Sequence, residues 1–226
     1  MKYIKRYVRH LQKFLETRFV SNVIEKTIWK YKHFYRPRWA NTSINSYQIK
    51  QRHKFVSSIA SFENIESVLE IGCAAGPNLR LLREKLPEAK LTGVDINKKC
   101  IERGNRYFQS VNDNNATLYT KSTDQLEFFK DKTFDIVCTQ GVLLLLPPNK
   151  IRKAIADIVR LSKKGIILHE YNKDNATDGF FDNGRWVYDY PAILREFLNN
   201  PTIEISSSSF EGGSWTTYGR IIRISF

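Results

Sequence analysis

Short apolar segments alternate with amphipathic helical segments along most of the chain, and this alternation limits the fold more than any other feature. Strands are predicted at Ser67–Ile71, Lys90–Asp95, Ala116–Thr120, Phe134–Thr139 and Lys164–His169. Helices are predicted between them, near Asn78–Leu86, Asn97–Val111, Ser122–Phe129 and Asn149–Leu161. Strands that alternate with helices in this way favour a parallel sheet with helices on both faces.

The last part of the chain predicts a different connection. After a helix at Pro191–Asn199, two further strands are predicted at Thr202–Phe210 and Arg220–Phe226. Residues 211–219 between them are few enough for a hairpin-like return, so these two strands should be antiparallel. We therefore expect an α/β fold with a Rossmann-like, doubly wound, mostly parallel seven-stranded sheet and an antiparallel C-terminal strand pair.

Basic residues are concentrated in the first quarter of the chain. Residues 1–62 carry 14 Lys and Arg against two acidic residues, whereas residues 63–226 carry 22 against 21. Apolar residues recur at three- and four-residue steps from Tyr3 to Ile28, which predicts an amphipathic helix, and a second helical segment is predicted at Tyr47–Phe62. We therefore divide the chain into a basic helical appendage, residues 1–62, and a core domain, residues 63–226.

The appendage has more than one interpretation. A helix rich in Lys and Arg with aromatic residues on its apolar side can lie in an anionic membrane interface, and the same pattern describes a helix that docks on its own core domain. The phosphate backbone of a nucleic acid is another anionic partner that such a segment suits.

Several features of the sequence bear on its location in the cell. The longest apolar run, Val142–Pro148, is too short to span a bilayer, and a secretory signal would need an apolar core and a cleavage site that are not present. The three cysteines are scattered without metal-ligand spacing, which indicates a reducing compartment and no metal site. The expected location is cytoplasmic, with peripheral contact at the inner membrane face if the helix binds lipid.

A glycine-bearing turn follows the first predicted strand, in VLEIGCAAGPNL (residues 68–79). The turn runs through Gly72–Gly76, and Pro77 suits the first turn of a helix. Phosphate-binding loops need several glycines and usually a lysine, but this turn has no lysine. Glu70, just before the turn, would repel a phosphate but could bond an ammonium group. A nucleoside triphosphate is therefore disfavoured as the ligand.

Asp95 ends the second predicted strand, where a carboxylate can accept hydrogen bonds from both ribose hydroxyls of an adenosine. It can also cap the helix that follows from Asn97, and the two roles are compatible. The segment EIGCAAG (residues 70–76) resembles the first cofactor motif of the class I S-adenosylmethionine-dependent methyltransferases, and Asp95 lies where this family has its ribose-binding acid. The resemblance covers about residues 65–226 and departs from the family at Ala74, where the family usually has a glycine.

The resemblance implies S-adenosylmethionine as the cofactor and a set of residues that contact it. Asp95 would hold the ribose and Ile96 would flank the adenine. Ser122 and Thr123 lie where the family often places an Asp that meets the adenine amine, and TFDIVCTQGVLLLLPP (residues 133–148) resembles the strand and loop that close over the methionine end. The full predicted set is Glu70, Gly72, Cys73, Ala74, Gly76, Asn78, Asp95, Ile96, Ser122, Thr123 and Gln140.

Polar residues also follow the fifth predicted strand, in GIILHEYN (residues 165–172). Ligands of open α/β sheets lie outside the carboxyl ends of the strands, so His169 and Glu170 are candidates for the general base that deprotonates an acceptor. Alternatively, one of them is buried and structural, because neighbours on a strand point to opposite faces. The long segment that follows is expected to bind the acceptor, through Tyr171, Asn172, Arg185, Trp186 and Asp189.

These features predict a metal-independent S-adenosylmethionine-dependent methyltransferase that O-methylates a glycan or a lipid-linked sugar precursor. The strings TQGVLLLLPP, HEYN and GRWVYDY are similar to segments of methyltransferases from bacterial surface-glycan gene clusters. Two alternatives stay open. One is an RNA-modifying methyltransferase, although the chain lacks the Asn/Asp-Pro-Pro-Tyr/Phe type of segment at the strand tip. The other is a catalytically inactive cofactor-binding interaction protein.

Overall fold

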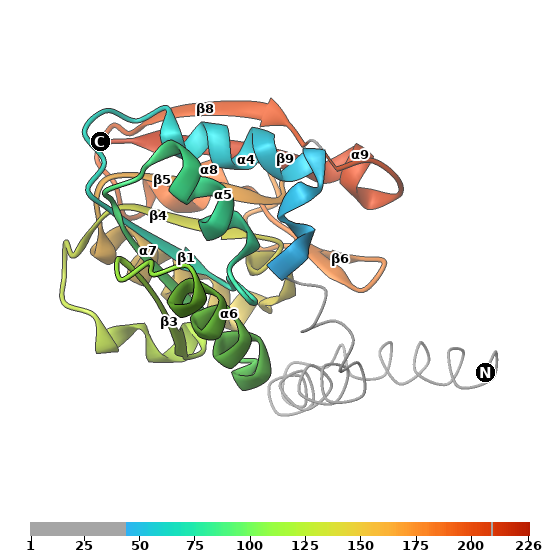
Figure 1. The fold of residues 1–226 in the computed structure, drawn as a ribbon. Coiled ribbons are helices and arrows are strands. Elements are labelled where there is room, and N and C mark those ends of the chain that lie inside the picture. The colour runs from blue at the N-terminus through green and yellow to red at the C-terminus, as the bar shows by residue number, and fades with distance from the viewer. Residues whose placement is uncertain (1–43, 209) are drawn as a thin grey trace. The chain divides into compact units, whose positions relative to one another are not determined.

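The computed structural model describes residues 44–208 and 210–226, so the amphipathic pattern from Tyr3 to Ile28 lies outside the described residues. The described chain forms a seven-stranded sheet in the order β3-β2-β1-β4-β5-β9-β8 and a separate two-stranded hairpin, β6–β7 (Figure 1). The strands of the large sheet are β1 (Ser67–Ile71), β2 (Lys90–Asp95), β3 (Ala116–Thr120), β4 (Phe134–Gln140), β5 (Ser162–Tyr171), β8 (Thr202–Ser207) and β9 (Gly219–Ser225).

The strand pairing confirms the predicted fold class. β1 pairs in parallel with β2 and β4, β2 pairs in parallel with β3, and β4 pairs in parallel with β5. β9 pairs antiparallel with both β5 and β8, as expected for the C-terminal pair. Because the strand order reverses beside β1, the topological switch point lies between β1 and β4. Ligands of such sheets bind at the carboxyl ends of the strands at this point.

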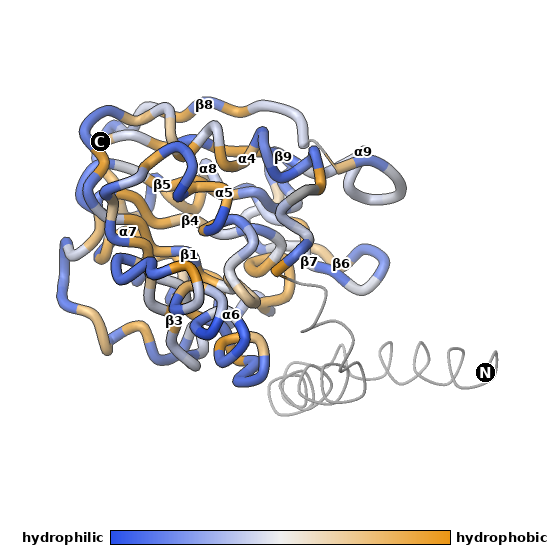
Figure 2. The backbone as a smooth tube through the Cα atoms, viewed as in Figure 1, coloured by the Kyte–Doolittle hydropathy of each residue, from blue (hydrophilic) through white to orange (hydrophobic). Residues whose placement is uncertain are grey.

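Helices cover both faces of the sheet and bury a separate apolar cluster on each. On one face, α4 (Lys50–Ala60), α5 (Pro77–Lys85) and α6 (Lys98–Ser110) contribute to a cluster that includes Phe55, Leu82, Phe108, Ile136 and Ile167. On the other face, α7 (Pro148–Leu161) and α8 (Tyr190–Arg195) pack over residues that include Val137, Ile155, Ile166 and Leu194. Apolar residues accordingly lie along the central strands, and polar residues lie on the outer loops and helices (Figure 2).

The second predicted helical segment of the appendage packs on the sheet domain. It forms the 3-10 turn η1 (Ile44–Gln48) and α4, whose residues Phe55, Val56 and Ile59 are buried in the core. This part of the chain therefore belongs structurally with the sheet. The division at residue 62 stays a prediction, because residues 1–43 lie outside the described chain.

Two elements near the end of the chain were not predicted. The hairpin β6 (Phe180–Asp182) and β7 (Arg185–Val187) has strands too short for a recognisable alternation of apolar and polar residues. Its turn, Asn183–Gly184, has φ values of 45° and 84°, the left-handed geometry that an Asn-Gly pair favours. The expected turn at residues 211–219 contains a further short helix, α9 (Ser214–Tyr218).

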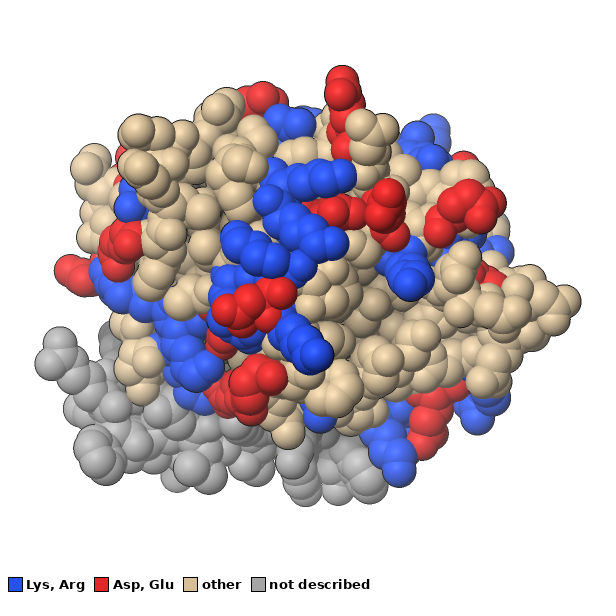
Figure 3. All heavy atoms as spheres, turned by 90° about the vertical axis from the view of Figure 1, so that its left-hand side faces the viewer, with Lys and Arg blue, Asp and Glu red and all other residues tan. Residues whose placement is uncertain are grey.

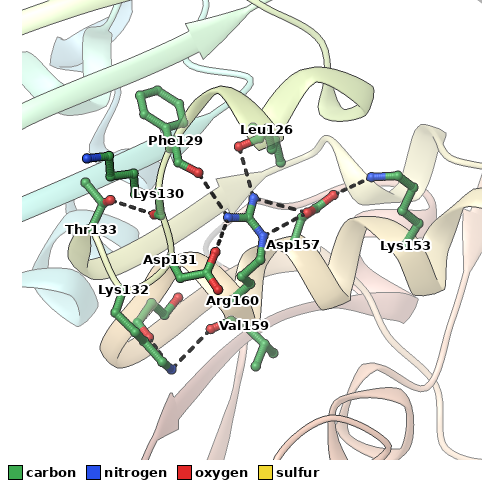
Figure 4. A network of polar contacts seen from close by, with 11 residues as sticks. Leu126, Phe129, Lys130, Asp131, Lys132, Thr133, Lys153, Asp157, Val159 and Arg160 are labelled. Carbon is green, nitrogen blue, oxygen red and sulfur yellow. Dashed lines mark hydrogen bonds and ion pairs between the residues drawn. The ribbon is translucent and has the colours of Figure 1, made fainter.

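Arg160 near the end of α7 fixes the segment that follows β3 (Figure 4). Its guanidinium donates hydrogen bonds to the carbonyl oxygens of Leu126 and Phe129, at 3.1 and 3.0 Å, and to the Asp131 carboxylate at 2.7 Å. Asp157, one helical turn earlier, accepts from Arg160 and from Lys153. This network holds the 3-10 helix η2 (Thr123–Phe128), which carries predicted adenine contacts, against α7.

Candidate active site

Three residues of the turn after β1 have left-handed backbone conformations. Gly72, Ala74 and Gly76 have φ values of 75°, 52° and 80°. The amides of Gly72 and Cys73 both donate to the carbonyl oxygen of Val94, at 2.7 and 3.0 Å, which ties the turn to β2. A Cβ atom on Gly72 would overlap the side chain of Val142, so the loop after β4 packs directly on the turn. The turn therefore requires Gly72 for both conformation and space.

Glu70 is a buried carboxylate at the carboxyl end of β1. Its Oε1 accepts a hydrogen bond from Asn78 Nδ2 at 2.6 Å, but no described residue donates a hydrogen bond to its buried Oε2. Burial raises the pKa of Glu70 to about 7, while the Asn78 bond and the charge of Arg52 oppose that rise. A buried oxygen without a partner is costly, and it is well suited to accept from a cationic ligand group.

Arg52 of α4 brings a positive charge to the same place. Its Nη1 donates to Asn78 Oδ1 and to Gln140 Oε1, both at 2.9 Å, and its Nε donates to the Ser46 carbonyl oxygen. Burial lowers the pKa of the guanidinium, and the Glu70 carboxylate opposes this shift. Sequence reasoning missed Arg52 because it lies among other basic residues of the appendage, and only the packing of α4 distinguishes it.

Asp95 links the turn to the next helix. Its Oδ2 accepts from the Ala74 amide at 2.9 Å and its Oδ1 accepts from the Asn97 amide at 2.8 Å. The cap of α6 is the side chain of Asn97, which accepts from the Cys100 amide. Burial raises the pKa of Asp95, and the two backbone hydrogen bonds oppose that rise. Beside it, Ile96 is 41 % exposed, an apolar surface at the predicted adenine position.

The remaining predicted cofactor residues differ in which of their atoms a ligand could contact. Cys73 is buried in the apolar core, so only its backbone can face a ligand on the turn. Ser122 and Thr123 are half-buried at the start of η2, and the Ser122 amide donates to Gln125 Oε1. Gln140 at the tip of β4 joins Asn78 and Arg52 through its side-chain oxygen. The structure thus brings the predicted residues of β1, β2 and β4 together at the switch point.

Both candidate bases are buried at the end of β5. His169 lies between Gln140 Nε2, 2.9 Å from its Nδ1, and Ser208 Oγ, 2.7 Å from its Nε2. Burial, together with the charges of Lys54 and Arg52, lowers the pKa of His169 to about 3. An imidazole in this state is neutral near pH 7, with both nitrogens already engaged. Its role as a general base stays a prediction that these contacts do not favour.

Glu170 points to the opposite side of β5 and shapes the loop after β4. Its Oε1 accepts from Thr139 Oγ1 at 2.8 Å and from the Val142 amide at 2.9 Å, and its Oε2 accepts from the Leu144 amide at 3.1 Å. Burial raises its pKa to about 7, opposed by these same hydrogen bonds. The contacts account for Glu170 as a support of this loop, and its catalytic role stays a prediction.

The predicted acceptor residues divide into buried supports and half-buried groups. Asn172 and Asp189 are buried and accept backbone hydrogen bonds from Tyr190, Ala192 and Asn175, so they shape the segment between β5 and α8. Tyr171 is also buried, whereas Arg185 and Trp186 of β7 are half-buried.

An aromatic group beside these residues was not predicted. Trp215 and Tyr218 of α9 and Phe180 of β6 pack around Tyr171, and the ring centroids of Trp215 and Tyr171 are 4.8 Å apart. Ser214 of α9 donates to the Asp182 carboxylate of the hairpin at 2.6 Å, and Figure 1 shows β6 and α9 at the same end of the sheet. These residues come from separate segments, and no spacing in the sequence connects them.

Comparison with known proteins identifies the domain. Residues 68–165 match the model of the family described as "Methyltransferase domain", and they include the turn, Asp95 and Gln140. Residues 68–165 of this chain therefore form a methyltransferase domain. The resemblance stated from the sequence motifs is therefore confirmed, and the methyltransferase domain contains the switch point at which Glu70, Asn78 and Gln140 meet.

Solved methyltransferase structures share the fold. The magnesium protoporphyrin IX methyltransferase of Synechocystis PCC 6803, solved with bound S-adenosylmethionine, is 20% identical, with a TM-score of 0.62 over 89% of this chain and 96% of its own. The 1,6-didemethyltoxoflavin N1-methyltransferase of Burkholderia thailandensis, solved with S-adenosylhomocysteine, is 13% identical, with a TM-score of 0.65 over 90% and 86%. A protein of Pyrococcus horikoshii OT3 is 18% identical, with a TM-score of 0.63 over 85% and 98%. At these identities the likeness concerns the fold.

Curated relatives are uncharacterized proteins. One from Rickettsia prowazekii is 29% identical over 107 residues, which are 46% of this chain and 42% of the relative. One from Haemophilus influenzae is 26% identical over 109 residues, which are 47% of this chain and 43% of the relative. The match thus spans less than half the length of either relative.

Among residues 44–208 and 210–226, no helix is long and apolar enough to cross a membrane. The same residues contain no group of three or more His, Cys, Asp or Glu side chains arranged to hold a metal ion.

Proposed function

We propose that this chain transfers the methyl group of S-adenosylmethionine to an acceptor hydroxyl, with the amino-acid end of the cofactor held between Glu70 and Arg52. The unpartnered Oε2 of Glu70 carries this proposal, because it lies beside Asn78 in a buried site that Arg52 also enters. A carboxylate that lacks a donor and a guanidinium bound only to neutral oxygens suit a ligand that carries both an ammonium and a carboxylate group.

We assign the adenosine end of the cofactor to the tip of β2, next to β1. Asp95 lies at the tip of β2 with its two oxygens each accepting one backbone hydrogen bond, at 2.9 and 2.8 Å, so lone pairs are left for ribose hydroxyls. Ile96 and the start of η2 at Ser122 and Thr123 offer an apolar surface and small polar groups for the adenine. These positions agree with the roles that the class I resemblance implies.

When bound, S-adenosylmethionine would supply a methyl group on a positively charged sulfur. The acceptor oxygen would bond to this methyl carbon as its bond to sulfur breaks, S-adenosylhomocysteine would leave, and the hydroxyl proton would pass to a base or to water. The chain has to bring the two reacting atoms together, and such positioning can supply roughly 7–11 kcal/mol of the barrier. Glu170 contributes by fixing the backbone of Val142 and Leu144 in the loop after β4. The packing of that loop on Gly72 ties it to the turn after β1.

The proposal is tested by comparing the affinities of two ligands, only one of which has the amino-acid end. S-adenosylhomocysteine has the amino-acid end, and 5′-methylthioadenosine lacks it. We expect Arg52→Ala to weaken binding of S-adenosylhomocysteine roughly tenfold or more in calorimetry, the scale of a lost charge-assisted hydrogen bond. Binding of 5′-methylthioadenosine should be nearly unchanged.

Lys50→Ala is the matched control, because Lys50 is an exposed cation on the same helix. It should leave both affinities unaltered. Equal losses for the two ligands in Arg52→Ala would show that Arg52 supports α4 and does not recognise the amino-acid end. No heat with either ligand on folded wild-type protein would contradict cofactor binding altogether.

The acceptor that we propose is a hydroxyl of a glycan or of a lipid-linked sugar precursor. Aromatic side chains at the β5 end, among them Trp215, Tyr218 and Phe180, offer apolar ring faces next to polar groups, a composition typical of small-molecule sites. The structural neighbours act on a porphyrin and on a toxoflavin precursor, so the fold does not select the acceptor. Mass spectrometry of surface glycans, lipids and RNA from cells with and without the gene would identify it.

We further propose that residues 1–40 bring the enzyme to the inner face of the membrane, where a lipid-linked acceptor would be found. This segment carries 11 Lys and Arg against two Glu, whereas the described residues carry 25 against 21. One face of the described domain shows Lys and Arg interspersed with Asp and Glu, so this face is not a uniformly basic surface (Figure 3).

Pelleting with acidic and neutral liposomes tests this localisation. Each Lys or Arg near an anionic surface is worth about 1 kcal/mol, an attraction that salt screens. We expect salt-sensitive binding of the full chain to acidic liposomes and weak binding to neutral ones. Tight binding of RNA without binding to acidic liposomes would overturn the membrane proposal and favour an RNA acceptor.

A further inference from the structure

We infer that His169 is a positioning residue, held as its neutral Nε2–H tautomer by Gln140, that joins the cofactor end of the site to the segment bearing Ser208, Phe210 and Trp215. The inference rests on the proposed function only in identifying Arg52, Asn78 and Gln140 as the cofactor end. The hydrogen bonds and ring contacts themselves do not depend on that function.

The orientation of the Gln140 amide is set by its neighbours. Asn78 Nδ2 lies 3.1 Å from Gln140 Oε1, and Arg52 Nη1 lies 2.9 Å from the same atom. Both neighbours are donors, so the atom between them has to be the amide oxygen. The amide nitrogen of Gln140 therefore faces His169, at 2.9 Å from Nδ1.

This orientation fixes the tautomer of His169. An amide nitrogen only donates, so Nδ1 has to accept and the ring proton has to be on Nε2. The Nε2–H group then donates to Ser208 Oγ at 2.7 Å. A protonated ring would place a second donor against the Gln140 amide nitrogen and would leave one of the two donors unsatisfied in a buried place.

The charged groups that face His169 also favour the neutral ring. The ring is fully buried, and the cations Arg52 and Lys54 both approach it from α4. Gln140 of β4, Ser208 after β8, and the rings of Phe55, Phe210 and Trp215 are its uncharged neighbours. With both nitrogens engaged, His169 has no lone pair available to accept a proton from an acceptor.

The ring of His169 contacts Phe210 and Trp215, and these are the residues that it positions. It stacks on Phe210 with centroids 4.9 Å apart and planes 12° apart, and it meets Trp215 edge to face at 5.0 Å. The Phe210 amide donates to Ser208 Oγ at 2.8 Å, so the hydroxyl and the ring stack hold one segment. Trp215 lies 3.8 Å from the place where a Cβ on Gly141 would stand, immediately after Gln140. His169 thereby sets the position of Trp215 beside the tip of β4.

Histidine NMR on the full chain labelled with ¹⁵N at the imidazole nitrogens tests the tautomer. The signal of His169 is assigned by its loss in His169→Asn. We expect the neutral Nε2–H pattern at every pH from 5 to 9. Gln140→Glu places an acceptor against Nδ1, so it should produce a ring that is protonated at Nδ1 and titrates within this range. This response tests the hydrogen bond that Gln140 donates to Nδ1.

A second measurement tests the link to Trp215. Saturation with S-adenosylhomocysteine should shift the indole N–H signal of Trp215, assigned by its loss in Trp215→Phe, and His169→Phe should abolish this response. His169→Phe keeps an aromatic ring but loses both hydrogen bonds. If that variant fails to fold, His169→Asn serves in its place, because it keeps an acceptor for Gln140 and loses the bond to Ser208.

Each outcome bears on a separate claim. An Nδ1–H tautomer, or a wild-type His169 that titrates between pH 5 and 9, would overturn the inference and restore the general-base role. The same Trp215 response in the wild type and in the folded variant would refute the link. Absence of S-adenosylhomocysteine binding in calorimetry, with the tautomer as expected, would refute the proposed function and leave the tautomer assignment standing.

Discussion

The two halves of the site are built in different ways. The cofactor half includes, at the tips of β1 and β2, a turn that depends on backbone conformation: left-handed residues at Gly72, Ala74 and Gly76, and amides that donate to Asp95. The half that we propose for the acceptor, at the end of β5, depends on side chains from distant segments, such as Trp215 of α9 and Phe180 of β6 around Tyr171.

The difference suggests how each half can change. A turn that needs particular backbone angles tolerates few residues at few positions, and these positions are adjacent in the chain. A group of rings tolerates any side chain of suitable size from several segments. This contrast is consistent with structural neighbours that share the fold and act on different molecules. It also gives each half a distinct response to substitution.

The largest effect is expected from Gly72→Val. The substitution strains a residue at a φ of 75° and overlaps the side chain of Val142. We expect the free energy of unfolding to fall by roughly 3 kcal/mol or more, and S-adenosylhomocysteine binding to be lost. Urea denaturation and calorimetry measure the two quantities.

Gly72→Ala combined with Val142→Ala tests the cause of that loss. The pair removes most of the overlap and retains the strained φ, so it should recover part of the stability. Full recovery would show that space alone demands glycine here, and no recovery would assign the requirement to the backbone angle.

Trp215→Ala should affect the other half of the site. Trp215 is half-buried, so its removal should cost about 1–3 kcal/mol of stability, less than a fully buried ring. The affinity for S-adenosylhomocysteine should change by less than about threefold, well under 1 kcal/mol. A loss of cofactor binding as large as that of Gly72→Val would contradict the division of the site into two halves.

The difference between the two halves of the site also explains which parts of the structure could be predicted from the sequence. The five parallel strands were predicted because buried β-branched and aliphatic runs are local signals, and β1, β2 and β3 have the predicted bounds. The glycine-bearing turn and Asp95 were found because their residues follow the strand ends in the chain. The antiparallel C-terminal pair was also predicted correctly.

The parts that sequence reasoning missed depend on tertiary contacts. Arg52 reaches Gln140 across 88 positions of the chain, and no local pattern distinguishes it from Lys50 or Lys54. His169 was weighed as a base because of its place at a strand end, but its partners Gln140 and Ser208 are visible only in the fold. The hairpin at Asn183–Gly184 had a turn signal, although its strands were too short to confirm it.

The pH dependence of cofactor binding isolates Glu70 within the cofactor half. Its pKa is raised to about 7, so below that pH the free site holds a proton that an ammonium group must displace. We expect the affinity for S-adenosylhomocysteine to rise with pH between about 5.5 and 7, by at most tenfold per unit, and then to level off. Calorimetry across this range measures the slope.

Glu70→Gln supplies the control, because this variant should bind S-adenosylhomocysteine more weakly near pH 8 and its affinity should not change with pH.

The stability of the ligand-free protein should change with pH in the opposite direction to the affinity. A carboxyl whose pKa rises from 4.5 to about 7 on folding contributes stability below pH 4.5 that is lost as the pH passes through 7. An unchanged slope in Glu70→Gln would place the titrating group elsewhere in the cofactor half.

The smallest effect is expected at Ala74, where this chain departs from the family's usual glycine. Ala74 has a φ of 52°, a left-handed conformation that costs an L-residue about 1–2 kcal/mol. Ala74→Gly removes this strain but adds about 0.4–1 kcal/mol of conformational entropy to the unfolded chain. The net gain should be about 0.5–1 kcal/mol in the free energy of unfolding.

Chemical denaturation of the two proteins, together with binding of S-adenosylhomocysteine, measures this change. Affinity should stay within about twofold of the wild type, because the Ala74 amide that donates to Asp95 is retained in glycine. A substitution that stabilises the protein and weakens binding would mean that alanine holds the turn in its binding conformation. In that case the turn after β1 would depend on a side chain as well as on its backbone, and its contrast with the acceptor half would be smaller than the glycines suggest.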